Sequence, residues 1–244
     1  MVKILTWNIN KGGSFQRINS IAQQINKHSA DIVLLSEYWS GDKGDELQKQ
    51  LREYGYEYIV TSNGQPKQNH LLFASRYPFE VIPSSYQREK NMERWLEIKL
   101  IQQDIYILGI HIPTSQEKQE KKDFWIEVNN FANKNVNNKA VILGDYNTGL
   151  LEDAQGVPFY GMEFMRKLLD LSWIDTWRYT HGNFSGYSWY STKGNGFRID
   201  HVFVSPILHE VILESYFSHQ ERMSKISDHS VLIVELENKL NHLF

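Results

Sequence analysis

The sequence predicts an α/β protein in which β-sheets and helices form packed layers. Short apolar runs of strand length alternate with segments whose apolar residues recur at helical spacing. Some neighbouring strands are close enough for hairpins, whereas others need longer crossovers. No repeat, low-complexity tract or Pro/Gly-rich linker divides the 244 residues. We therefore expect one domain, residues 1–244, with an α/β layered sandwich architecture.

The first third of the chain is expected to alternate strands and helices. The expected strands are Val2–Trp7, Asp31–Ser36, Tyr56–Thr61, His70–Ser75 and Phe79–Ile82. One helix is indicated by the spacing of Ile18, Ile21, Ala22 and Ile25, and a second by Leu47, Leu51 and Tyr54.

The rest of the chain continues the pattern. Glu93–Ile101 and Asp104–His111 are expected to form a hairpin through Gln102 and Gln103. A helix bearing Phe124, Trp125, Val128 and Phe131 precedes the strand AVILGD at 140–145. The remaining expected elements are a helix with Met165, Leu168 and Leu169, and strands at 199–205, near Val211–Tyr216 and at 231–236.

Composition limits the chemistry that the chain can perform. There is no cysteine, which excludes disulfides, thiolate metal sites and a cysteine nucleophile. Neither a signal peptide nor an apolar run of about 18 residues is visible, so we expect a cytoplasmic protein without a transmembrane segment. The net charge is −3, so binding to nucleic acid would need a local basic surface, to which Lys67, Arg88, Lys90 and Arg94 could contribute.

Polar side chains with catalytic or metal-binding chemistry stand at the ends of the expected strands. In the first part of the chain they follow the strands, at Asn8, Glu37, His111, Asp145 and Asn147. In the last part they precede the strands, at Asp200, His201, Asp228 and His229.

This reversal of order has a geometric meaning. Strands that run in one direction end along the same edge of a sheet, and antiparallel strands begin there. We therefore expect these side chains to gather at one rim, on the loops where functional residues concentrate. Any one of them alone could be an ordinary turn or surface residue, but the repeated arrangement favours a single site.

The set fits metal-assisted hydrolysis of a phosphoester. A hard cation such as Mg²⁺, with Mn²⁺ as an alternative, needs one or two carboxylates and neutralises charge that develops on the phosphate. Glu37 is the first expected ligand, Asn8 would bind or orient the ion, and Asp228 would complete the site.

The remaining residues are expected to act on water and phosphate. His229 is a candidate general base, because imidazole titrates near neutral pH, and Asp200 would orient its ring. Asp145 and Asn147 would align the attacking water, although Asp145 is also a candidate base. His111 would donate a hydrogen bond to the developing oxyanion.

At these positions the chain resembles the endonuclease/exonuclease/phosphatase superfamily, which has the deoxyribonuclease I-like fold. The matching motifs are TWN (6–8), SE (36–37), GIHIP (109–113), GDYN (144–147), RIDHVFVS (198–205) and SDHS (227–230). They occur in the family's order and span nearly the whole chain. The resemblance implies a two-sheet sandwich flanked by helices in four layers, and Mg²⁺-dependent phosphoester hydrolysis.

Residues 175–206 look like the nuclease branch related to exonuclease III. That resemblance implies substrate contacts from aromatic and arginine side chains, here Trp177, Arg178, Trp189, Tyr190 and Arg198. Burial in the core is the competing interpretation of Trp177 and Trp189.

Other positions differ from the abasic-site enzymes of that branch. No lysine follows Glu37 closely, and Asn10 stands where those enzymes often have an acidic residue. They tend to have Tyr where this chain has His111, which is more like deoxyribonuclease I, sphingomyelinases, deadenylases and tyrosyl-DNA phosphodiesterases.

The leading functional prediction is a monomeric nuclease or related phosphodiesterase that acts on nucleic acid. The alternative is a phosphatase or phosphodiesterase for lipid, inositol or other small phosphorylated substrates. A basic groove would favour nucleic acid and a deep closed pocket would favour a small molecule. The least favoured interpretation is a binding module without catalysis, because every expected catalytic position is filled.

Overall fold

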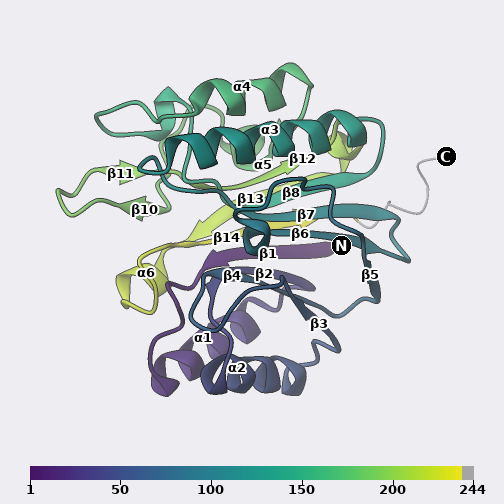
Figure 1. Cartoon of the computed structure of the whole chain (residues 1–244), viewed down its shortest axis with the longest axis vertical. Helices are drawn as coiled ribbons and strands as arrows, with labels where there is room; N and C mark the ends of the chain where they lie inside the picture. Colours follow the sequence, from purple (N-terminus) through teal and green to yellow (C-terminus); the bar gives the residue numbers. More distant parts are fainter. Residues whose placement is uncertain (238–244) are drawn as a thin grey trace.

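A computed structural model describes residues 1–237 as two six-stranded sheets packed face to face. Helices cover the outer face of each sheet, so that four layers are visible in Figure 1. This is the two-sheet α/β sandwich that the sequence predicts. Among residues 1–237, no helix has the length and apolar character needed to cross a bilayer.

The first sheet is built from both ends of the chain, in the order β13-β14-β1-β2-β4-β3. Its strands are β1 (Val2–Asn8), β2 (Ile32–Tyr38), β3 (Tyr58–Thr61), β4 (His70–Ser75), β13 (Ile212–Ser218) and β14 (Val231–Leu236). β1 is parallel to β2 and antiparallel to β14.

The second sheet comes from the middle of the chain, in the order β5-β6-β7-β8-β12-β9. Its strands are β5 (Phe79–Val81), β6 (Trp95–Leu100), β7 (Ile105–His111), β8 (Ala140–Asp145), β9 (Ile174–Asp175) and β12 (Asp200–Val204). β7 is parallel to β8, and β12 is antiparallel to β8.

The helices occupy three positions. They are α1 (Phe15–His28), α2 (Asp42–Glu53), α3 (Lys118–Asn135), α4 (Met162–Asp170), α5 (Thr176–His181) and α6 (Gln220–Met223). α1 and α2 cover the first sheet, and α3 and α4 cover the second, whereas α5 contacts β12 and β13 at the side of the sandwich. A small hairpin of β10 (Trp189–Tyr190) and β11 (Gly196–Phe197) projects from the same end of the molecule as α6.

Alternation along the strands explains the layers. In β1, Ile4 packs into the core between the sheets, while Leu5 and Trp7 pack toward α1 and α2. In β8, Leu143 faces the core between the sheets and Ile142 faces α3. Both faces of each central strand are therefore buried, which is why these strands appear in the sequence as continuous apolar runs.

Most of the expected elements are confirmed within a few residues, including the hairpin of β6 and β7. The sequence analysis missed β9, α5, β10, β11 and α6, each only two to six residues long. Such short elements are too brief to show a hydrophobic period.

Candidate active site

The polar strand ends converge at the seam between the two sheets. Asn8 pairs in register with Ser36, beside Glu37, because β1 and β2 run in parallel. In the second sheet, Asp145 pairs with His111 on one side and with Asp200 on the other. β14 begins just after His229, beside the end of β1. The strand ends meet at one rim as expected, except at His201, which is fully buried with its Nε2 2.9 Å from the carbonyl oxygen of Thr148.

The converging side chains line a cavity of about 230 Å³. It is bounded by residues from both sheets and the loops between them: Asn8, Glu37, Asn69, Arg94, His111, Thr114, Asp145, Asn147, Trp189, Ile199, Asp228 and His229. Asp200 is joined to this set through its hydrogen bond to His229.

Asn8 links the carboxylates of the two sheets. Its side-chain N–H group donates to Asp145 Oδ2 at 2.9 Å and to Glu37 Oε1 at 3.4 Å. Its side-chain oxygen accepts from the backbone N–H of Asn10 at 2.9 Å. Of the two roles expected for Asn8, this geometry favours orienting the carboxylates over binding the ion.

Asp200 and His229 form a buried pair. His229 Nδ1 lies 2.8 Å from Asp200 Oδ2, and both residues are at most 5% exposed. Burial by itself would lower the pKa of His229, but the charge and hydrogen bond of Asp200 raise it to about 10. The pair therefore favours an imidazolium, and within residues 1–237 its Nε2 has no hydrogen-bond partner and can donate to a ligand.

Asp145 lies at the centre of the cluster. Its Oδ1 accepts from the backbone N–H of Asn147 at 2.8 Å, while Oδ2 accepts from Asn8. Burial and the negative charge of Asp200 raise the pKa of Asp145 to about 7. Asn147 has φ 46°, a left-handed conformation that asparagine tolerates, and its side chain donates to the carbonyl of Ile112.

His111 is buried between the two sheets. Its Nε2 lies 3.7 Å from Asp145 Oδ2 and 3.9 Å from Glu37 Oε1. Burial, with the positive charge of Arg94 nearby, lowers the pKa of His111 well below its usual range. The ring is therefore neutral at neutral pH and keeps one N–H donor.

Gly144 allows β8 to approach β7 at the point where the site begins. It has φ 141°, and a Cβ built there would lie 1.9 Å from the carbonyl oxygen of Ile110. No side chain fits in this position, so the glycine of the GDYN motif fixes the distance between His111 and Asp145.

The donor set fits a hard divalent cation. Glu37 has φ 53° and is partly exposed, and its carboxylate has only two long contacts among residues 1–237, from Asn8 at 3.4 Å and from His111 at 3.9 Å. Asp228 also lines the cavity, and Asp200 Oδ1 is buried without a hydrogen-bond partner in the same described range. Asp145, Asp200 and His229 present ligand atoms within 4.8 Å of one another, so this trio could also hold an ion.

Sequence comparison agrees with this geometry. Residues 5–229 match the endonuclease/exonuclease/phosphatase family. The chain belongs to this family. An exodeoxyribonuclease of Bacillus subtilis (strain 168) is 22% identical over 239 residues, which cover 89% of this chain and 93% of that protein. The chain is therefore a member of a family of phosphoesterases.

Solved structures of family members share the fold. An AP endonuclease from Archaeoglobus fulgidus matches with a TM-score of 0.84 and 21% identity, over 97% of this chain and 100% of the other. A 3′ phosphatase, NExo, from Neisseria bound to a product DNA hairpin gives 0.83 and 20% identity over the same shares. At these identities, the structural matches establish the fold.

Three of the expected substrate contacts do not line the cavity, and two of them, Arg198 and Trp177, are buried and require correction. Arg198 is fully buried, with ion pairs to Asp153 and Asp175 at 2.7–2.8 Å. Trp177 is 4% exposed and belongs to the core between the sheets. Arg178 pairs with Asp153 and donates to loop carbonyls. Arg198 and Trp177 are therefore part of the protein interior, whereas Arg178 is partly exposed and remains a predicted substrate contact.

Of the other two expected contacts, Trp189 lines the cavity and Tyr190 lines a neighbouring hollow. Trp189 donates from its indole N–H to Asp228 Oδ2 at 3.2 Å. Tyr190 is 39% exposed and lies under the guanidinium of Arg222, in the hollow that also contains Arg17 and Asp228. Both remain predicted substrate contacts.

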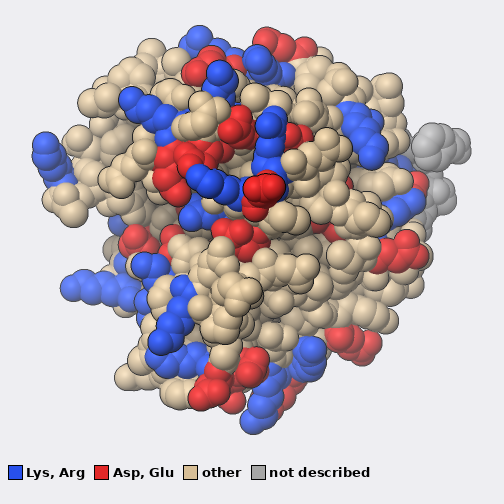
Figure 2. Space-filling model, viewed as in Figure 1, with Lys and Arg blue, Asp and Glu red and all other residues tan. Residues whose placement is uncertain are grey.

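The sequence analysis missed the role of Arg94 in this site and treated it only as a surface charge. Arg94 lines the cavity, and its Nε and Nη1 are buried without a hydrogen-bond partner among residues 1–237. Arg94 directly precedes β6, so its position at a strand end could have indicated a place in the site, as it did for the other polar residues. Basic and acidic side chains are interspersed on the face shown in Figure 2, without a continuous basic surface there.

Proposed function

We propose that this protein is a divalent-metal-dependent phosphodiesterase that hydrolyses nucleic acid by attack of water on phosphorus. The supporting observation is the single cavity in which carboxylate, amide and imidazole groups from both sheets meet. The names of family relatives point to the same substrate: an exodeoxyribonuclease, an AP endonuclease and a 3′ phosphatase bound to DNA.

The cationic and neutral donors of the cavity would bind the phosphate. Arg94 Nε and Nη1 have no hydrogen-bond partner in the described part of the chain, and the Asp200–His229 pair keeps an imidazolium facing the cavity. His111, held neutral by burial, donates one N–H to an oxygen that gains charge as water attacks. Together these groups favour the transition state over the bound substrate.

Asp145 is the proposed general base. It is held by Asn8 and Asn147 from two sides, and Asp200 already pairs with His229, so Asp145 is the central carboxylate that remains to accept a proton. As water loses this proton, its oxygen bonds to phosphorus and the bond from phosphorus to the leaving oxygen breaks. The leaving oxygen then takes up a proton, so that one water is added across the ester.

Glu37 and Asp228 are the proposed ligands of Mg²⁺ or Mn²⁺. When bound, the ion would neutralise charge on the phosphate oxygens and orient the leaving oxygen. Asn8 supports this site by fixing the orientation of the Glu37 carboxylate.

Cleavage of defined nucleic acids tests the proposal. Supercoiled plasmid, single-stranded DNA, RNA and a DNA carrying a 3′ phosphate are incubated with Mg²⁺, with EDTA, and with Asp145→Ala. Asp170→Ala is the matched control, because Asp170 is exposed at the end of α4. We expect metal-dependent hydrolysis by wild type and by Asp170→Ala, and loss of that activity in Asp145→Ala.

The same experiment identifies the alternative substrate class. If no nucleic acid is hydrolysed while an inositol phosphate or a phospholipid head group is, then the protein is a phosphoesterase for small substrates and the nucleic-acid proposal is wrong.

A further inference from the structure

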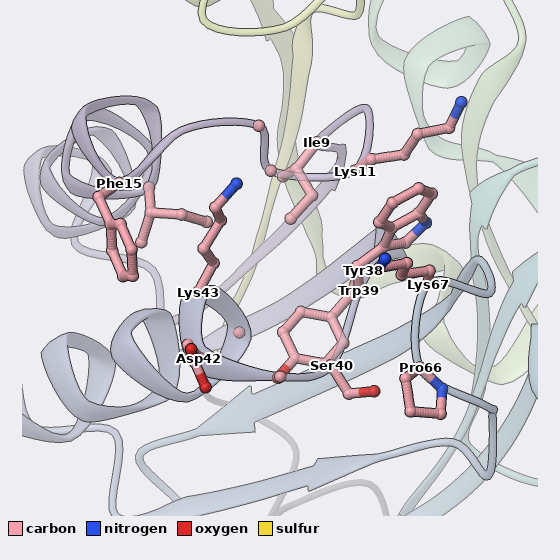
Figure 3. Close-up of a pocket in the computed structure, with 15 residues that line it drawn as sticks. Ile9, Lys11, Phe15, Tyr38, Trp39, Ser40, Asp42, Lys43, Pro66 and Lys67 are labelled. Atoms are coloured by element: carbon pink, nitrogen blue, oxygen red, sulfur yellow. The ribbon is translucent and has the colours of Figure 1, made fainter.

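A second cavity of about 640 Å³ lies beside the catalytic one, within the size range of small-molecule sites. It is formed by the loop after β1 with the start of α1, by residues 38–44 from the end of β2 to the first turn of α2, and by Pro66 and Lys67, as Figure 3 shows. We call it the side pocket. Nothing in the proposed hydrolysis uses these residues.

Trp39 connects the side pocket to the catalytic cavity. Its ring lines the side pocket, while its indole N–H donates to Asn69, which lines the catalytic cavity. The backbone N–H of Lys11 donates to the carbonyl of Glu37 at 3.0 Å. A substrate strand held in one cavity therefore lies next to the other.

The wall of the side pocket is apolar and aromatic. Ile9 and Tyr38 are buried beneath it, and Trp39 is half-buried at its side. Phe15, the first residue of α1, is 51% exposed at the opposite side in Figure 3. An open hollow between two aromatic rings offers stacking surface to a flat aromatic ligand.

Lysines surround this apolar wall. Lys11, Lys43 and Lys67 are exposed, and none of them forms an ion pair within residues 1–237. The Lys11 ammonium stands 5.8 Å from the centre of the Trp39 ring. Among the residues that line the pocket, Asp42 is the single carboxylate, so the rim is positive.

We propose that the side pocket holds an unpaired nucleobase of the strand being cut, with the lysines on the flanking phosphates. The combination of stacking rings and ammonium groups fits a nucleotide, which is flat and apolar on one part and anionic on another. This inference rests on the proposed function and narrows it to strands with unpaired bases. A base inside a duplex would first have to leave its stack.

Equilibrium binding tests the proposal without relying on turnover. Full-length Asp145→Asn is titrated, by fluorescence anisotropy, into a single strand containing 2-aminopurine and into a blunt duplex. Phe15→Ser in this background is expected to weaken single-strand binding about tenfold. It should also remove the quenching of 2-aminopurine and change duplex binding less than twofold. Phe15 is exposed, so the fold should tolerate this change.

A charge variant tests the rim. Replacing Lys11, Lys43 and Lys67 together by Gln should weaken single-strand binding and reduce the slope of log K against log salt by about 2. The matched control replaces Lys49, Lys122 and Lys134, which are exposed on α2 and α3, and should bind as the parent does.

Three outcomes would contradict the proposal that the side pocket holds a nucleobase. The first is that both variants bind the single strand as tightly as their parent. The second is that affinity falls equally for single strand and duplex, which would make the lysines general contacts to the nucleic-acid backbone. A third such outcome is that wild type binds phosphatidylserine vesicles and Phe15→Ser does not, while Phe15→Ser still binds the single strand as its parent does. Failure of wild type to cleave any nucleic acid is a separate result, which contradicts the proposed function.

Discussion

Individual site residues could be predicted because they are polar residues that recur at the ends of apolar strands. Asn8, Glu37, His111, Asp145 and His229 all reach one cavity, as the repeated pattern indicated. Arg198 shows the limit of this reasoning. A motif shows which residue is present but not whether its side chain points outward, and Asp153, its buried partner, lies 45 positions away.

Replacing His229 tests the imidazolium of the buried pair. We expect His229→Ala to lower kcat by roughly 10²–10³-fold, because the phosphate loses a preorganised donor. Steady-state kinetics on the nucleic acid that wild type cleaves best will measure this. His209→Ala, at an exposed position, is the control and should retain full activity. A loss of less than tenfold in His229→Ala would remove this residue from catalysis.

Replacing Arg198 separates a structural role from substrate binding. Arg198→Gln leaves Asp153 and Asp175 buried without their cation, so we expect a loss of about 3–5 kcal/mol in the free energy of unfolding. Urea denaturation measures this loss, with Arg166→Gln on the exposed face of α4 as the control. Unchanged stability with a raised KM would instead restore the substrate contact expected from the sequence.

At the scale of elements, the long strands and helices were predictable and the short ones were not. α3 is eighteen residues long and buries Phe124, Trp125 and Val128 at helical spacing. α5 has only six residues and is held by Asp175, whose side chain accepts from the N–H groups of Trp177 and Arg178. Asp175 thus caps the N-terminus of α5, and it belongs to β9, a two-residue strand that is defined by its pairing with β12.

α3 also contains a buried lysine that the sequence pattern did not mark. Lys121 is 0% exposed, and its ammonium donates to the carbonyl of Asn147 at 2.6 Å. Burial lowers the pKa of Lys121 to about 8. The helix therefore supports the Asn147 turn at the site while carrying an amine that readily loses its proton.

This lysine should make stability depend on pH. Between pH 8 and 10.5 the unfolded chain still holds the proton that the folded chain has released, so the free energy of unfolding rises with pH. Relative to Lys121→Met, wild type should gain roughly 2 kcal/mol between pH 7 and 10. Urea denaturation of both proteins across this pH range gives the difference in their free energies of unfolding. Tyrosines titrate in both proteins, so their contribution cancels in this difference. A constant difference would contradict the lowered pKa.

At the scale of the whole molecule, the α/β class and the convergence of the site followed from strand order and direction. The arrangement of strands within each sheet did not, because partners such as β1 and β14 are more than 220 residues apart. Only the family resemblance indicated two sheets in four layers, and the structure confirms it. The monomeric state and the cytoplasmic location remain predictions.

Removing the metal should weaken the whole fold. The seam between the sheets holds Glu37, Asp145, Asp200 and Asp228, whose mutual repulsion a bound cation would relieve. Mg²⁺ at about 100 times its Kd should raise the free energy of unfolding by roughly 2.7 kcal/mol, or Tm by about 5–10 °C. Calorimetry with Mg²⁺, and with EDTA at equal ionic strength, measures this shift. Glu37→Gln should lose most of it, and an equal shift in that variant would exclude Glu37 as a ligand.

The position of β14 also decides when the chain can become active during its synthesis. β14 lies between β13 and β1, and Asp228 and His229 stand three and two residues before its start, more than 200 residues after Asn8. Until β14 leaves the ribosome, β1 has an unpaired edge and the cavity is not completed by Asp228 and His229. We therefore expect a chain that stops before β14 to be inactive in hydrolysis.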